Sequence, residues 1–276
     1  MMIRSISAVV LAIALGLGVV APGGAQAPGT LVVGLVAEPV NLDPAQVTDL
    51  NSNRVGRRIV ETLVTFPEES TQIVSGLAES WTVSKDGLRY TFKLRKNVTF
   101  HDGTPFDAAA VKFSIERQIM TEHPFNKLGK YPFANYFFGN VKAVEAVEPH
   151  TVEFVLKEPR ASFLAVLTAG AASIVSPTAV KKLGVDYALS PVGTGPFKFV
   201  AWDRGQRVVL EKNASYWKHP VRVDRVIYRP IVEDQARLTE LLTGALDLIV
   251  GTPPDFVAQL ENNPRVTLLK LSLIHI

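Results

Sequence analysis

Apolar stretches alternate with polar loops along most of the chain, and they predict a mixed α/β protein. The apolar run at 31–36 has the length of a buried strand and leads into a loop at 37–44 that contains two prolines. Apolar positions between Arg54 and Thr65 recur at helical spacing and predict a helix. The small, apolar segment 163–172 predicts a buried helix.

Two segments have the pattern of β-hairpins. After the turn Lys85-Asp86-Gly87, residues 88–95 alternate between apolar and polar or basic side chains, which predicts a half-exposed sheet. A second hairpin is predicted at 197–210, where Gly205 joins its strands, directly after a tight turn at 193–196.

Helices and strands are also expected to alternate in the last third of the chain. The pattern predicts a strand at 223–231, a helix capped by Asp234, a strand at 246–250, a short helix that ends near Glu261, and a strand at 266–270. This order predicts a right-handed parallel unit. Earlier in the chain, Asp107 is expected to cap a helix that runs to about Met120, and 151–157 is expected to be a strand.

Composition narrows the functional classes. The 276 residues carry a net charge of +3, which gives no support to a nucleic-acid partner. The chain has no cysteine, so disulfides, thiolate zinc sites, cysteine nucleophiles and lipid attachment through an N-terminal cysteine are excluded. Its five histidines are too scattered to predict a metal site, and no phosphate-binding or dinucleotide-binding glycine motif predicts a cofactor.

The two ends of the sequence have special patterns. An apolar run at 6–20 precedes Ala25-Gln26-Ala27, so residues 1–27 are interpreted as a Sec signal peptide that directs the protein to the periplasm without a lipid anchor. The last six residues, 271–276, resemble a translated transposon end used in sequencing libraries, and we interpret them as a scar.

Two short motifs raise the question of catalysis. Residues 215–218 match the SxxK pattern of penicillin-interacting serine enzymes, and a periplasmic hydrolase using Ser215 and Lys218 is the alternative from a different functional class. The motif follows a strand and has no KTG or SDN partner, so a chance match is favoured. For the adjacent His101 and Asp102, structural hydrogen bonds in a turn are favoured over an acid–base pair.

Several stretches, in order along the chain, together resemble the family 5 extracellular solute-binding proteins of ABC transporters, which bind dipeptides, oligopeptides and nickel. The resemblance covers nearly all of residues 30 to 270. Its motifs are Glu38-Pro39, Leu42-Asp43-Pro44, and the segments 76–81, 86–95, 98–106, 191–197 and 213–217.

The resemblance implies an α/β periplasmic-binding-protein fold of type II, in the large peptide-binding cluster, with two lobes that close on a ligand. Members of the family are longer than this chain, so we expect the first lobe with an inserted subdomain, and a second lobe that is largely missing. The expected segments are lobe I at 28–62 and 189–254, the inserted subdomain at 63–188, and the start of the hinge or second lobe at 255–270.

The candidate ligand-binding residues come from two loops that follow predicted strands. Ligands of open α/β sheets bind beyond the carboxyl ends of the strands. We therefore expect Glu38, Pro39, Asn41, Thr252 and Pro253 to line the cleft. Glu38 is either a partner for a ligand amine or an ordinary exposed acid, and both interpretations stay open. The resemblance places the main charge partners of peptide termini in the missing lobe.

The function expected from the resemblance is a monomeric, non-enzymatic binding protein without a cofactor. It captures short peptides and delivers them to an ABC permease and ATPase at the inner membrane. Nickel chelates, glutathione and sugars remain alternative ligands within the same class. A sensor or adhesion module that binds but never transports remains another alternative.

Overall fold

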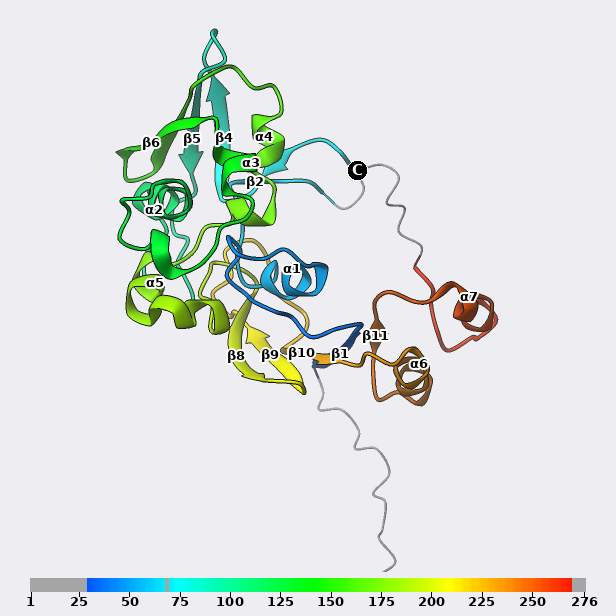
Figure 1. The fold of residues 1–276 in the computed structure, drawn as a ribbon. Helices are drawn as coiled ribbons and strands as arrows, with labels where there is room; N and C mark the ends of the chain where they lie inside the picture. Colours follow the sequence, from blue (N-terminus) through cyan, green and yellow to red (C-terminus); the bar gives the residue numbers. More distant parts are fainter. Residues whose placement is uncertain (1–28, 68–69, 270–276) are drawn as a thin grey trace, which may run out of the picture.

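The computed structural model describes residues 29–67 and 70–269, so the predicted signal peptide at 1–27 and the predicted scar at 271–276 lie outside it. The described residues form a five-stranded sheet, a four-stranded sheet and a small two-stranded sheet, and the buried apolar side chains gather in two clusters, one at each of the two larger sheets. Figure 1 shows these two sheets at opposite ends of the molecule. None of the helices in the described ranges is long and apolar enough to cross a membrane.

Sequence patterning predicts most of the longer strands and helices that the structure contains. The strands are β1 (Thr30–Leu35), β2 (Val64–Thr65), β3 (Val74–Ser75), β4 (Ala78–Val83), β5 (Arg89–Leu94), β6 (Val141–Glu148), β7 (Thr151–Leu156), β8 (Phe197–Asp203), β9 (Arg207–Lys212), β10 (Arg225–Pro230) and β11 (Leu248–Ile249). The α-helices are α1 (Leu50–Gly56), α2 (Ala108–Ile119), α3 (Ala134–Phe138), α4 (Phe163–Val166), α5 (Pro177–Leu183), α6 (Asp234–Thr243) and α7 (Pro254–Glu261).

The five-stranded sheet has the order β11-β1-β10-β9-β8. Strand β1 is parallel to both of its neighbours, β10 and β11, whereas β9 and β8 continue the sheet in antiparallel fashion. The predicted parallel unit is confirmed for its first two strands, because β10 and β11 are both parallel to β1 in one sheet, although β1 lies between them. The third strand, predicted at 266–270, is wrong over the described residues 266–269, which form no strand and follow a turn in which the Val266 amide donates to the Asn263 carbonyl.

The four-stranded sheet is antiparallel, with the order β4-β5-β7-β6, and α2 packs over it. The predicted hairpin is confirmed: Tyr90, Phe92 and Leu94 point into the core, and Gly87 takes the positive φ of 70° that the turn requires. Asp107 is the N-cap of α2, as predicted, because its carboxylate accepts the amide of residue 110.

The helix predicted from Arg54 to Thr65 is wrong beyond Gly56. The buried residues there are in the core as expected, but the chain after α1 uses its carbonyls to bind other segments. The carbonyls of Arg58 and Ile59 accept the amides of Phe197 and Gly195, at 3.1 and 2.9 Å. A helix needs these carbonyls for its own amides, so long-range contacts end the helical geometry.

The other two predicted helix boundaries also change. The segment expected to be one helix at 163–172 is α4 followed by a short 3-10 turn at 170–172, and the Thr168 carbonyl between them accepts a hydrogen bond from the Arg57 side chain at 2.9 Å. Helix α6 is capped by Glu233, not Asp234: the Glu233 carboxylate accepts the amide of residue 236 at 2.7 Å. Gly244 ends α6 with a φ of 80°.

Candidate functional site

Four connecting segments meet at one edge of the five-stranded sheet. Because β1, β10 and β11 are parallel, the loops that follow them, 36–41, 231–233 and 250–253, leave the sheet at the same edge. Strand β9 is antiparallel to β10, so the turn from β8 to β9, residues 204–206, lies there too. This edge, which we call the carboxyl edge, is the place where open α/β sheets bind ligands.

Glu38 is bound to the β8–β9 turn. Its Oε1 atom accepts hydrogen bonds from Trp202 Nε1 and from the Gly205 amide, each at 2.9 Å, and lies 3.8 Å from the Arg204 guanidinium. The other oxygen, Oε2, has no hydrogen bond from any described residue. Glu38 is thus no ordinary exposed acid, since one of its oxygens joins two segments of the carboxyl edge.

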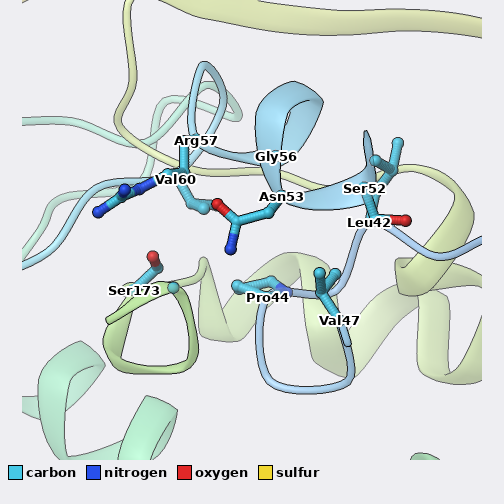
Figure 2. Close-up of a pocket in the computed structure, with 10 residues that line it drawn as sticks. Leu42, Pro44, Val47, Ser52, Asn53, Gly56, Arg57, Val60 and Ser173 are labelled. Atoms are coloured by element: carbon cyan, nitrogen blue, oxygen red, sulfur yellow. The ribbon is translucent and has the colours of Figure 1, made fainter. Parts of the chain in front are cut away.

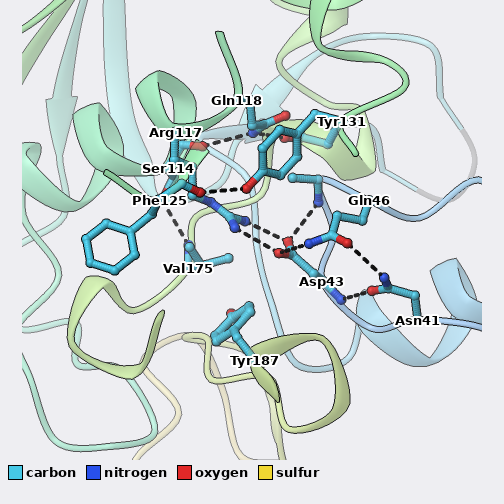
Figure 3. A network of polar contacts seen from close by, with 12 residues as sticks. Asn41, Asp43, Gln46, Ser114, Arg117, Gln118, Phe125, Tyr131, Val175 and Tyr187 are labelled. Carbon is cyan, nitrogen blue, oxygen red and sulfur yellow. Dashed lines mark hydrogen bonds and ion pairs between the residues drawn. The ribbon is translucent and has the colours of Figure 1, made fainter. Parts of the chain in front are cut away.

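The rest of the loop after β1 is held by a polar network, which Figure 3 shows. Asn41 Oδ1 accepts the amide of Asp43 at 2.7 Å, and its Nδ2 atom donates to Gln46 at 3.2 Å. Asp43 accepts two hydrogen bonds from Arg117 of α2, at 2.6 and 2.8 Å. Pro39 is buried, and its carbonyl lies 3.5 Å from a nitrogen of Arg204.

The ion pair between Asp43 and Arg117 is fully buried, with both side chains 2% exposed or less. Burial alone lowers the pKa of Arg117, but the adjacent Asp43 carboxylate outweighs it, so the net pKa is raised and the guanidinium stays charged. A buried charge that loses its partner is costly, so this pair holds the loop after β1 firmly against α2.

Thr252 and Pro253 lie at the carboxyl edge beside the loop after β1. Gly251 lies so close to Val36 that a Cβ atom added to Gly251 would be 2.9 Å from the Val36 side chain. Both Thr252 and Pro253 are half-buried. All five predicted residues therefore lie along the same edge, although the Asn41 side chain is used within its own loop.

Arg237 of α6 is a residue that the sequence patterns did not single out. Its side chain is buried and donates to the carbonyls of Ile231, Val232 and Gly251, at 2.6, 3.4 and 3.4 Å. One guanidinium thus joins the loop after β10 to the loop after β11. An arginine within a predicted amphipathic helix is ordinarily solvent-exposed, so nothing in the local pattern could have revealed this role.

Several cavities lie near the five-stranded sheet, and one of about 550 Å³ is lined by the β8–β9 turn, β10 and Val32 of β1. The crevice in Figure 2, between α1 and the segments around Pro44 and Ser173, has a volume of about 10 Å³ and holds no more than a water molecule. A cavity of about 510 Å³ lies on one face of the sheet and reaches the carboxyl edge at Leu35 and Val250. Its size suits a small molecule, and its lining is mostly apolar, with the side chains of Arg54, Arg58 and Arg222 among it.

The serine-hydrolase alternative lacks the local structure it needs. Ser215 lies in a turn, where its amide donates to Asn213 Oδ1, and no helix begins at 215–218. The motif instead holds Glu61: Tyr216 and Trp217 each donate to its carboxylate, at 2.8 and 2.9 Å. Burial raises the pKa of Glu61, and these hydrogen bonds, with one from Thr194, oppose that rise.

His101 and Asp102 make separate hydrogen bonds, as the structural interpretation predicts. The His101 ring bridges the turn at 193–195, with Nε2 2.9 Å from the Gly195 carbonyl and Nδ1 3.4 Å from the Gly193 amide. Asp102 accepts from Ser176 at 2.6 Å. Across the described ranges, no three histidine, aspartate or glutamate side chains cluster so that they could hold a metal ion.

Comparisons with known proteins agree with this geometry. The family described as "Bacterial extracellular solute-binding proteins, family 5 Middle" matches residues 72–272. The glutathione-binding protein GsiB of Escherichia coli O1:K1 / APEC is 34% identical over 240 residues, which make up 87% of this chain and 45% of that protein. The chain thus spans about half the length of the curated relatives it matches.

Solved structures are similar over the same half. The periplasmic binding protein DppA from Helicobacter pylori, in complex with the peptide STSA, has a TM-score of 0.80 and 36% identity, covering 85% of this chain and 49% of that one. NikZ from Campylobacter jejuni, in complex with Ni(L-His), has a TM-score of 0.76 and 28% identity, covering 87% and 46%. The predicted periplasmic-binding-protein fold is confirmed over this half, and the chain belongs to the bacterial extracellular solute-binding proteins of family 5.

Proposed function

We propose that this protein is the substrate-binding component of an ABC importer and that it captures short peptides in the periplasm. Two lobes close on the ligand, and the closed complex delivers it to an inner-membrane permease with its ATPase. The observation that carries the proposal is the meeting of three strand-end loops and one hairpin turn at the carboxyl edge. Similarity to DppA, whose structure is a complex with the peptide STSA, supports peptides as the ligand class.

The ligand-binding residues we propose are Glu38, Pro39, Asn41, Thr252 and Pro253. Glu38 offers its open Oε2 atom to a ligand amine, and the hydroxyl of Thr252 offers a neutral hydrogen-bonding group. Asn41 acts by holding the loop, because its side-chain amide already binds Asp43 and Gln46. The protein works as a periplasmic monomer exported through a Sec signal peptide, without a lipid anchor, a cofactor or a catalytic group.

Glutathione is the second candidate ligand, and similarity to the glutathione-binding protein GsiB favours it. Glutathione is itself a short peptide with free carboxylates, so the same edge loops suit it. A nickel chelate is a third candidate because of the similarity to NikZ.

Isothermal titration calorimetry on the protein expressed from its complete gene tests the proposal. The probes are STSA, a mixed library of dipeptides to pentapeptides, glutathione and Ni(L-His). Peptides are expected to give saturable heat. Thr252→Trp should weaken peptide binding at least about tenfold, because a bulky side chain fills the edge. Thr243→Trp is the matched control. Thr243 is the last residue of α6 and precedes β11, whereas Thr252 follows β11, so this variant should bind like the wild type.

Each result has a defined meaning. Saturable binding of peptides that only Thr252→Trp weakens supports the proposal. Binding of glutathione or Ni(L-His) with no response to any library peptide overturns the peptide assignment in favour of that ligand. The absence of heat with all four probes contradicts a solute-binding role for these ligand classes.

A further inference from the structure

The β8–β9 turn brings an arginine to the carboxyl edge that the proposed function does not use. Arg204 lies in this turn, and its Nη1 atom is 3.5 Å from the Pro39 carbonyl, in the loop after β1. A guanidinium from a hairpin turn therefore stands beside the loop expected to contact the ligand.

The orientation of this guanidinium is fixed by an aromatic ring. The central carbon of the Arg204 guanidinium lies 3.6 Å from the centre of the Trp202 ring, a cation–π contact. Trp202 is itself fixed, because its indole nitrogen donates to Glu38 Oε1 at 2.9 Å. One face of the planar guanidinium rests on the indole, so its N–H groups point away from the ring in the guanidinium plane. The donors are therefore oriented before any ligand binds.

The donors of Arg204 are nearly unused. In the described part of the chain, its hydrogen-bond and ion-pair partners are the Pro39 carbonyl at 3.5 Å and Glu38 Oε1 at 3.8 Å, and that oxygen already accepts two hydrogen bonds at 2.9 Å. The side chain is 52% exposed. Arg207 of the same hairpin differs, because its Nε atom donates to Asp203 at 2.8 Å.

We infer that Arg204 binds a carboxylate of the captured solute. A planar guanidinium with two free N–H groups matches a carboxylate in a two-pronged hydrogen bond, which a neutral amide cannot reproduce. The ligand class is a small solute with a free carboxylate, such as a peptide with an unblocked C-terminus. Glu38 keeps the indole and the turn in place through its Oε1 atom, so it positions Arg204. This inference rests on the proposed function.

The test compares two arginines of one hairpin in the protein expressed from its complete gene. Arg204→Gln and Arg207→Gln remove the same charge from side chains of equal exposure, 52% and 53%. Calorimetry uses STSA with a free C-terminus, STSA with a C-terminal amide, and glutathione. Arg204→Lys, which keeps the charge but loses the fork, is a further variant, and thermal unfolding shows that each variant folds.

Arg204→Gln should weaken binding of the free-acid STSA by about tenfold or more and leave the amide unchanged, while Arg207→Gln binds both like the wild type. Arg204→Lys should recover part of the loss. Equal loss for acid and amide, or no loss for the acid, overturns the inference and leaves the proposed function standing. If the wild type binds none of the three probes, the proposed function fails first and this inference fails with it.

Discussion

His101 acts as a neutral bridge that fixes the turn in front of β8. The Gly195 carbonyl can only accept, so Nε2 carries the proton and donates to it, while Nδ1 accepts from the Gly193 amide. Burial lowers the pKa of His101 to about 4, with a smaller opposing effect from the hydrogen bond to Gly195. The ring is therefore uncharged at neutral pH, and protonation would break its bond to the Gly193 amide.

This lowered pKa predicts a pH dependence of stability. The unfolded chain takes up a proton on this histidine near pH 6.5, and the folded protein does so only near pH 4. The stability that neutral His101 contributes is thus present above pH 6.5 and is lost as the pH falls toward 4. Between pH 7.5 and 5.0 we expect the advantage of the wild type over His101→Gln to shrink by about 2 kcal/mol, measured by urea unfolding.

Comparing the wild type with the variant removes the contributions of other groups, including Glu61, whose raised pKa acts in the opposite direction over part of this range. His219→Gln, at an exposed position, is the matched control and should follow the wild-type profile. A wild-type advantage over His101→Gln that stays constant from pH 7.5 to 5.0 would contradict the neutral bridge.

At the scale of residues, sequence predicted what depends on near neighbours. The N-cap at Asp107 and the turn at Gly87 follow from local backbone geometry, and both are confirmed. The ion pair of Asp43 with Arg117 joins positions 74 apart, and Tyr216 reaches Glu61 across 155 positions. No local pattern encodes such partners, because only the folded chain brings them together.

At the scale of elements, the approach of the turn at 193–196 to the chain after α1 requires a glycine. A Cβ added at Gly195 would lie 2.5 Å from the Arg58 carbonyl oxygen and 2.8 Å from backbone atoms of Ile59. Since backbone must move to make room, Gly195→Ala should lower the free energy of unfolding by at least about 2 kcal/mol, measured by urea unfolding.

Gly56→Ala is the control for this prediction. Gly56 ends α1, and an added Cβ there would meet nothing within 4 Å. Its effect should stay within about 1 kcal/mol, because alanine also favours the helix. Equal effects of the two substitutions would mean that the turn does not pack against the chain after α1 as described.

Elements were predicted well where their own pattern decides the structure. The alternating hairpin of β4 and β5 and the helix α2 form where expected. Prediction failed at 57–65, where apolar spacing indicated a helix but the carbonyls of Arg58 and Ile59 bind Phe197 and Gly195. There, tertiary hydrogen bonds override the local preference.

At the scale of the whole molecule, the five candidate residues were chosen by the rule that ligands bind at the carboxyl ends of parallel strands, and all five lie along the carboxyl edge. The order of the strands did not follow from the sequence, because β1 enters between two strands from the far end of the chain. The part of the edge formed by Trp202 and Arg204 was missed for the same reason. Their hairpin was predicted, but its place beside β10 was not.

The most direct test of the central claim, that ligands bind at the carboxyl edge, is hydrogen–deuterium exchange on the protein from its complete gene, with and without saturating STSA or whichever probe binds in calorimetry. We expect slower amide exchange on ligand binding in the loops 36–41, 231–233 and 250–253 and in the turn 204–206. Exchange in the exposed part of α3 should not change. Protection confined to segments away from these four would show that ligands bind elsewhere.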